Sequence, residues 1–140
     1  MFHDLYQYED RHKLNAFYAE SKTRMAPYNC TIIRKFSMDA VKDFPDLSLD
    51  FVYIDGNHDF QNVTNDIVEW GKKVRIGGIV SGHDYVRHLF LPHRAIIQVK
   101  EVVDAYTAAY RISPWFMCRG LHRSIESITD DGRSFMWVKA

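Results

Sequence analysis

Leu49–Ile54 forms a short and almost continuous apolar run, and an Asp-Gly turn follows it directly. Runs of this kind are typical of parallel strands that other elements cover on both faces. A parallel partner needs a crossover, and residues 59–74 supply one, because apolar side chains recur there at steps of three and four. With a second short strand predicted over 79–81, the segment indicates a βαβ unit.

The rest of the chain continues this alternation of helices and strands. Periodicity predicts helices over 9–25, 37–44 and 94–110, and β-branched or aromatic runs predict strands over 30–36, 115–118 and 135–139. The last two strands have no helix between them, so they are expected to pair antiparallel. The fold class indicated is α/β: a Rossmann-like, mostly parallel sheet with an antiparallel C-terminal strand, in three layers, as one domain over residues 1–140.

The composition of the chain argues against some classes of function. Of the 140 residues, 18 are basic and 18 are acidic, and this balance argues against a protein that coats nucleic acid, which needs uncompensated Lys and Arg. No apolar run is long enough to span a membrane, and the first residues lack the pattern of a secretory signal, so a cytoplasmic location is expected. In that reducing compartment Cys30 and Cys118 are predicted to be buried free thiols.

Polar side chains gather just beyond the predicted strands, where open α/β sheets bind their ligands. Sequential parallel strands are usually neighbours, so two carboxylates and two histidines are expected in one cluster. A structural role is the alternative for each residue alone, since Asp55 before glycine suits a turn and Asp59 suits a helix cap. The residues concerned are Ser37, Asp55, Gly56, His58, His83 and Asp84.

The segment over 49–85 carries a recognisable pattern. It contains Ile-Asp-Gly-Asn-His at 54–58, Asp-Ile-x-x-Trp at 66–70 and Gly-His-Asp-Tyr at 82–85. Together these motifs resemble the class I S-adenosylmethionine-dependent methyltransferases, and above all a small bacterial group with Ile-Asp-Gly-x-His and Gly-His-Asp-Tyr turns. The resemblance extends over roughly residues 4–139, because the last strand also fits the antiparallel last strand of that family.

This resemblance implies S-adenosylmethionine as the cofactor and assigns residues to it. Asp4 matches the acidic residue that accepts hydrogen bonds from the cofactor ribose, and Ser37 and Met38 match positions near the adenine. The rest of the implied cofactor set lies after the next strand: Asp55, Gly56 and His58.

One part of the family pattern is missing. The family's first strand ends in an acidic, glycine-rich turn around the methionine end of the cofactor, whereas all seven glycines here lie at Gly56 or later. We therefore expect an N-terminally truncated form of the fold that lacks the first strand, the first helix and most of the second strand. Three outcomes stay open: a fragment of a longer protein, direct pairing of the flanking strands, or a second chain that fills the gap.

The reaction implied is methyl transfer by in-line displacement, with an oxygen of a small molecule as the expected acceptor. The acceptor hydroxyl must lose its proton, which calls for a base or a divalent cation. Metal-binding relatives use an Asp after the fourth strand and an acidic pair after the fifth, and Asp55, His83 and Asp84 match those positions. Because histidine is a poor Mg²⁺ ligand, two interpretations stay open: a softer metal ion on these residues, or His83 and Asp84 as the catalytic pair, with His83 as the base.

The acceptor pocket and two competing functions complete the expectations. Tyr85 and Trp115 are candidates for the acceptor pocket, and residues 86–94 are expected to cover it or to form an oligomer contact. A chain without the glycine turn could instead be a non-catalytic module that completes its sheet against a partner, and unpaired strand edges favour a homo-oligomer. Residues 56–59, Gly-Asn-His-Asp, also match one signature of metallophosphoesterases, but the companion motifs that should follow upstream strands are missing.

Overall fold

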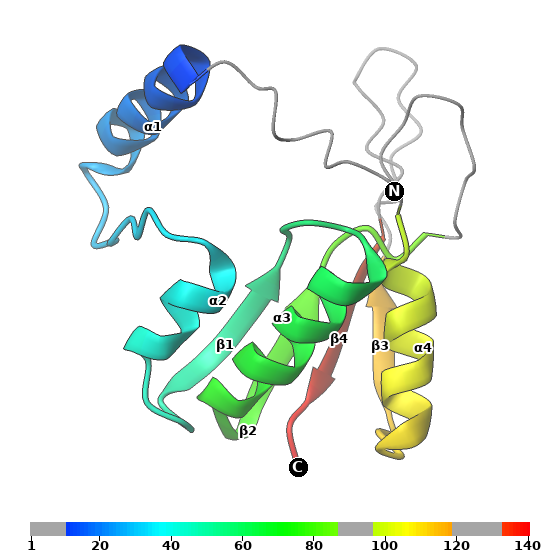
Figure 1. The fold of residues 1–140 in the computed structure, drawn as a ribbon. Helices are drawn as coiled ribbons and strands as arrows, with labels where there is room; N and C mark the ends of the chain where they lie inside the picture. Colours follow the sequence, from blue (N-terminus) through cyan, green and yellow to red (C-terminus); the bar gives the residue numbers. More distant parts are fainter. Residues whose placement is uncertain (1–10, 87–96, 119–132) are drawn as a thin grey trace. The chain divides into compact units, whose positions relative to one another are not determined.

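The structure is a computed structural model, and it describes residues 11–86, 97–118 and 133–140. Internal contacts divide the chain into two units, Met1–Lys35 and Phe36–Ala140. Figure 1 shows the elements of both units, coloured along the sequence. Every described strand belongs to the second unit, which therefore carries the candidate site.

The first unit contributes the helix α1 (Arg11–Met25), as the periodicity predicts. Its predicted apolar stripe is not buried, since Leu14 keeps 43% of its surface exposed. Arg34 returns to the helix: its guanidinium lies 4.7 Å from the centre of the Tyr18 ring and donates a 2.6 Å hydrogen bond to Asn15 Oδ1. These two contacts hold the segment after the helix against α1.

The strand predicted over 30–36 is wrong, because that segment forms no strand. Residues 31–33 have the β-branched side chains of a strand, but a strand is stable only beside a partner that satisfies its backbone hydrogen bonds. The described strands pair only among themselves, within the second unit. Cys30 is accordingly exposed, and so is Cys118; the predicted burial of both thiols is wrong, although both are free as expected.

The second unit is built on a four-stranded sheet in the order β1-β2-β4-β3. Its strands are β1 (Leu49–Ile54), β2 (Val74–Gly82), β3 (Trp115–Cys118) and β4 (Ser134–Val138). β1 and β2 are parallel, and β4 lies antiparallel between β2 and β3, so three strands run one way and β4 opposes them. This arrangement confirms the α/β, Rossmann-like class, including the antiparallel pairing of the last two strands.

Helices cover one face of this sheet. The long ones are α3 (Phe60–Lys73) and α4 (Val99–Ala109), and both lie over the same face in Figure 1. Ahead of β1, the short α2 (Ser37–Ala40) runs into the 3-10 turn η2 (Val41–Asp43). On the opposite face, Phe51 and Tyr53 keep 51% and 46% of their surface exposed. The third layer expected from the sequence is therefore not found among the described residues of this unit.

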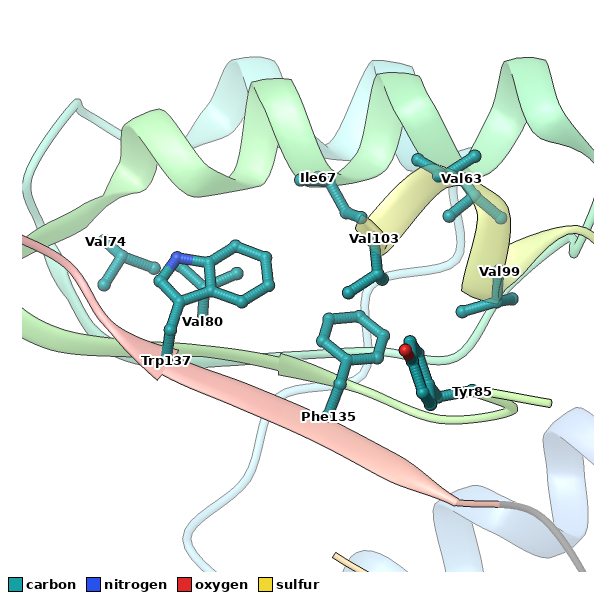
Figure 2. Packing of buried hydrophobic residues seen from close by; sticks show 10 residues of the cluster. Val63, Ile67, Val74, Val80, Tyr85, Val99, Val103, Phe135 and Trp137 are labelled. Atoms are coloured by element: carbon teal, nitrogen blue, oxygen red, sulfur yellow. The ribbon is translucent and has the colours of Figure 1, made fainter. Parts of the chain in front are cut away.

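The core lies between the sheet and these two helices, as Figure 2 shows. Val63 and Ile67 of α3 and Val103 of α4 point down at Phe135 of β4, and all four are at most 2% exposed. Fully burying such side chains contributes about 1.5–3 kcal/mol each before entropy is counted. No helix in the part of the chain that the structure describes is long and apolar enough to cross a membrane.

Both ends of α3 are fixed by side chains. Asp59 caps the first turn, where its Oδ1 accepts a 2.9 Å hydrogen bond from the backbone N–H of Asn62. The helix-cap role that the sequence suggested for Asp59 is therefore confirmed. At the other end the Lys139 ammonium donates 2.8 Å hydrogen bonds to the carbonyls of Gly71 and Val74. A cation at this end also suits the helix dipole. α3 is thus held so that its N-terminus stands at the edge where β1 ends.

Gly82, the last residue of β2, is packed without room for a side chain. A Cβ there would lie 2.6 Å from the Ile54 carbonyl oxygen and 2.6 Å from Cζ of Phe135. Such distances essentially do not occur between real atoms, so only glycine lets β2 end this close to both neighbours.

Replacing Gly82 by alanine is expected to destabilise the protein by about 1–3 kcal/mol, because the added methyl group overlaps backbone and ring atoms. The matched control is Gly71→Ala in α3, where a Cβ meets nothing within 4 Å and a helix gains about 0.5–1 kcal/mol on losing glycine. Thermal unfolding should move Tm in opposite directions for the two variants. A Gly82→Ala protein as stable as the wild type would contradict the close packing at Phe135.

Candidate functional site

The candidate site lies where β1 and β2 end side by side. The last residue of β1, Ile54, pairs with Gly82 at the end of β2. Asp55 and His83 are the next residues on the two strands, and the N–H of His83 donates a 3.0 Å hydrogen bond to the Ile54 carbonyl. The expectation that the two strand ends are neighbours is therefore confirmed.

Three side chains converge at this edge: Asp55, His58 and Asp84. One ligand-type atom from each lies within 4.8 Å of the other two. His58 Nε2 stands 2.8 Å from Asp84 Oδ2 and 3.6 Å from Asp55 Oδ1. The Asp55 side chain is 51% exposed, whereas those of His58 and Asp84 are about 20% exposed, at 19% and 23%. The cluster is thus open to solvent on the Asp55 side.

The Nε2 atom of His58 is buried without a hydrogen bond of acceptable geometry, although two carboxylates face it. A cation between the three groups would bind the carboxylate oxygens and the imidazole nitrogen together. Two ligands about 2.1 Å from one metal ion at right angles are about 3 Å apart, close to the separations found here. These residues could therefore hold a divalent cation with mixed nitrogen and oxygen ligands.

Asp84 joins this cluster to the second histidine. Its Oδ1 lies 3.2 Å from Nδ1 of His83, while Oδ2 faces His58. The backbone of Asp84 has φ 55°, in the left-handed region that non-glycine residues rarely adopt. Such strain persists where the surrounding structure requires it, and it concentrates at functional sites. The carboxylate is thereby held between two imidazoles, where it can orient either of them.

A second polar cluster joins α2 to α3. Ser37 is the first residue of α2, and its hydroxyl donates a hydrogen bond to the carboxylate of Asp66. Trp70 Nε1 donates a 2.8 Å hydrogen bond to the same hydroxyl. Asp66 is only 6% exposed. Burial raises its pKa above the ordinary value of 3.8, and the hydrogen bond from Ser37 lowers it in part.

The two clusters meet at Gly56. A Cβ on Gly56 would lie 3.4 Å from Asp66 Oδ2. Ser37 and Gly56, which the sequence assigns to one cofactor site, are therefore bridged by Asp66. Half-buried Met38 follows Ser37 on the same short helix.

The family comparison agrees with the motifs. The model of a protein family described as a methyltransferase domain matches residues 3–85 of the chain. That range is more than half of the chain, and it includes both polar clusters. The chain belongs to this methyltransferase domain family. A search of curated proteins gave no match.

Two further predicted site residues of this methyltransferase domain, Tyr85 and Trp115, belong to or pack on the core. Tyr85 is 6% exposed, donates a 2.6 Å hydrogen bond to Asp104 and meets the Trp115 ring edge-on at 5.3 Å. Burial first, and the Asp104 carboxylate second, raise the pKa of Tyr85. Asp4 and most of the predicted acceptor segment 86–94 lie outside the described residues.

Sequence reasoning missed Asp66, although a signal for it exists. Val63, Asp66, Ile67 and Trp70 stand at steps of three and four, so Asp66 lies on the apolar face of the predicted helix. A carboxylate there must find a buried partner, which here is Ser37. The sequence does not name that partner, because Ser37 is 29 residues away along the chain.

Asp66→Asn is expected to remove a dependence of stability on pH. Between the ordinary and the raised pKa, the folded state keeps a proton that the unfolded state has released, so stability falls as pH rises through this window. Asparagine cannot ionise, so the variant should gain stability relative to the wild type from about pH 4 upward. Urea unfolding from pH 4 to pH 7 measures the difference. Asp50→Asn, on an exposed side chain, is the control, and a gain of equal size there would refute the role of burial.

Proposed function

We propose that this methyltransferase domain transfers the methyl group of S-adenosylmethionine to an oxygen of a small-molecule acceptor. The observation that carries the proposal is the cluster of Asp55, His58 and Asp84, with His83 beside it, at the carboxyl edge of β1 and β2. Ligands of open α/β sheets bind at this edge. The family match covers the same segment.

In the proposed mechanism His83 removes the proton of the acceptor hydroxyl. Its Nδ1 side faces Asp84 Oδ1 at 3.2 Å, so the carboxylate orients the ring and stabilises the imidazolium that forms. Methyl transfer itself needs the acceptor oxygen in line with the sulfur–methyl bond, and positioning is the main contribution of the protein. Asp84 is then a positioning residue for the base.

A divalent cation is the second part of the proposal. Asp55, His58 and Asp84 would hold it, and the unsatisfied Nε2 of His58 supports this set over the one with His83. A bound cation lowers the pKa of a hydroxyl that it contacts. The nitrogen ligand favours Mn²⁺, Fe²⁺ or Zn²⁺ over Mg²⁺.

For the cofactor, the described residues offer a place for one end only. Ser37 and Gly56 lie beside Asp66 near the end of β1, and Met38 follows Ser37; the adenosine end would bind there. No glycine precedes Gly56, so residues 1–55 offer no close-approach turn for the methionine end. Residues 1–140 are therefore expected to bind S-adenosylmethionine weakly.

A second candidate function, a module that completes its sheet against a partner, is favoured by one observation. β1 stands at the edge of the described sheet, and Phe51 on it is half exposed. An open edge with apolar side chains invites another strand, from a second copy or from another protein. A monomer that transfers methyl groups would count against this candidate.

S-adenosylmethionine is expected to contact the protein at millimolar concentration, with its adenine and ribose protons closest. Saturation-transfer difference NMR detects such weak binding. Gly56→Leu should abolish the transferred signal, because the side chain fills the space beside Asp66. Gly71→Leu, at the far end of α3, is the matched control and should leave it unchanged. The proposed cofactor site would be overturned if the wild type gave no saturation-transfer signal. It would also be overturned if only Gly71→Leu lost that signal.

Mn²⁺ is expected to bind at Asp55, His58 and Asp84. NMR line broadening by Mn²⁺ should report an affinity that falls at least about tenfold in Asp84→Asn and in His58→Asn. Glu69→Gln, which changes an exposed carboxylate on α3, is the control and should bind as the wild type does. Because the cluster lies at a sheet edge, Tm of the Asp55→Asn and Asp84→Asn proteins should stay within a few degrees of the wild type. A large loss of stability with unchanged Mn²⁺ affinity would make these residues structural.

A further inference from the structure

A cavity of about 640 Å³ lies at the end of the sheet opposite to the candidate site. Val138 pairs with Ile79, and because β4 runs against β2, residues 138–140 extend toward the end where β2 begins. The last turns of α3 and α4, the loop over 111–114 and the start of β3 complete the wall. The size suits a small molecule, since ligand sites typically enclose about 300–1,000 Å³.

Aromatic rings form one wall of this cavity. The rings of Tyr106 and Tyr110 lie 4.5 Å apart, and those of Tyr106 and Trp137 lie 5.9 Å apart at 29°. Tyr110 and Phe116, which also line the cavity, keep 66% and 52% of their surface exposed. Flat aromatic surface of this kind favours a planar ring in offset stacking.

The charged side chains of the cavity all have one sign. Arg111 and Lys139 line it, and no lining side chain is a carboxylate. Lys139 is held by backbone carbonyls, so its positive charge is fixed at the wall. In the part of the chain that the structure describes, no side chain pairs with the Arg111 guanidinium. Its planar fork of donors matches the two oxygens of a carboxylate.

Arg111 also occupies a position where glycine is usual. It follows the end of α4 with φ 53°, and its N–H donates a 3.2 Å hydrogen bond to the Ala108 carbonyl. Helices commonly end in this left-handed conformation, and glycine adopts it without strain. An arginine there is costlier for the backbone, and this arginine lines the cavity.

We propose that this cavity binds a planar aromatic carboxylate, with its ring against Tyr106 and Tyr110 and its carboxylate on Arg111. The two parts of the ligand follow from the two parts of the wall, the aromatic surface and the Arg111 guanidinium. This site is separate from the cluster at Asp55 and Asp84, and it does not depend on methyl transfer.

The test compares 2-naphthoate with 2-naphthamide, which has the same shape and no charge. Binding is followed by ¹H–¹⁵N NMR shifts, including that of the Trp137 indole N–H. We expect the acid to bind at least about tenfold more tightly than the amide, because a charge-assisted bidentate pair is lost in the amide. Gly71→Leu should weaken both ligands, since its side chain enters open space at the cavity wall.

Arg111→Gly separates binding from folding. This variant removes the guanidinium and also relieves the backbone strain, so Tm should not fall while the preference for the acid disappears. Arg75→Gln, an arginine outside the cavity that pairs with Asp50, is the control and should keep the preference. Equal binding of acid and amide, no binding of either, or shifts confined to the Asp55 edge would each overturn the proposal.

Discussion

The parallel pairing of β1 with β2 is the constraint on which the site depends. The register Ile54 to Gly82 brings two strand ends together, and Gly82 has no room for a Cβ between the Ile54 carbonyl and the Phe135 ring. Inside the pair, the Ser81 hydroxyl donates a 2.8 Å hydrogen bond to the Val52 carbonyl. A slip by one residue would turn every side chain to the other face. That Asp55 and Asp84 follow neighbouring strand ends therefore depends on how closely the two backbones approach.

The sequence predicts well those segments whose pattern of apolar residues fits only one kind of secondary structure. The run at Leu49–Ile54, the periodic segment over α3 and the last two strands all pair or pack within the described unit, as predicted. The segment 30–36 failed because its β-branched pattern describes a strand only when a partner is present. Propensity is a local property, whereas a partner strand is supplied by the rest of the sheet.

The candidate site was predictable to the level of a sheet edge, but not to the level of contacts. Strand ends alone place Asp55 and Asp84 together. They do not decide which histidine completes the cluster, because that depends on the left-handed backbone of Asp84 and on the turn that brings back His58. Ser37 shows the same limit: a serine at a helix start predicts a cap, and only the fold reveals that a buried carboxylate competes for its hydroxyl.

The two candidate sites gather charged side chains of different sign. The carboxyl edge gathers Asp55 and Asp84, while the wall of the opposite cavity carries Arg111 and Lys139. β2, with nine residues, spans roughly 25–30 Å, well beyond the screening length of about 8 Å at physiological ionic strength. The family match ends at residue 85, whereas most of the cavity wall lies beyond residue 105. The first site thus lies within the segment that the family model matches, whereas most of the cavity wall lies outside it.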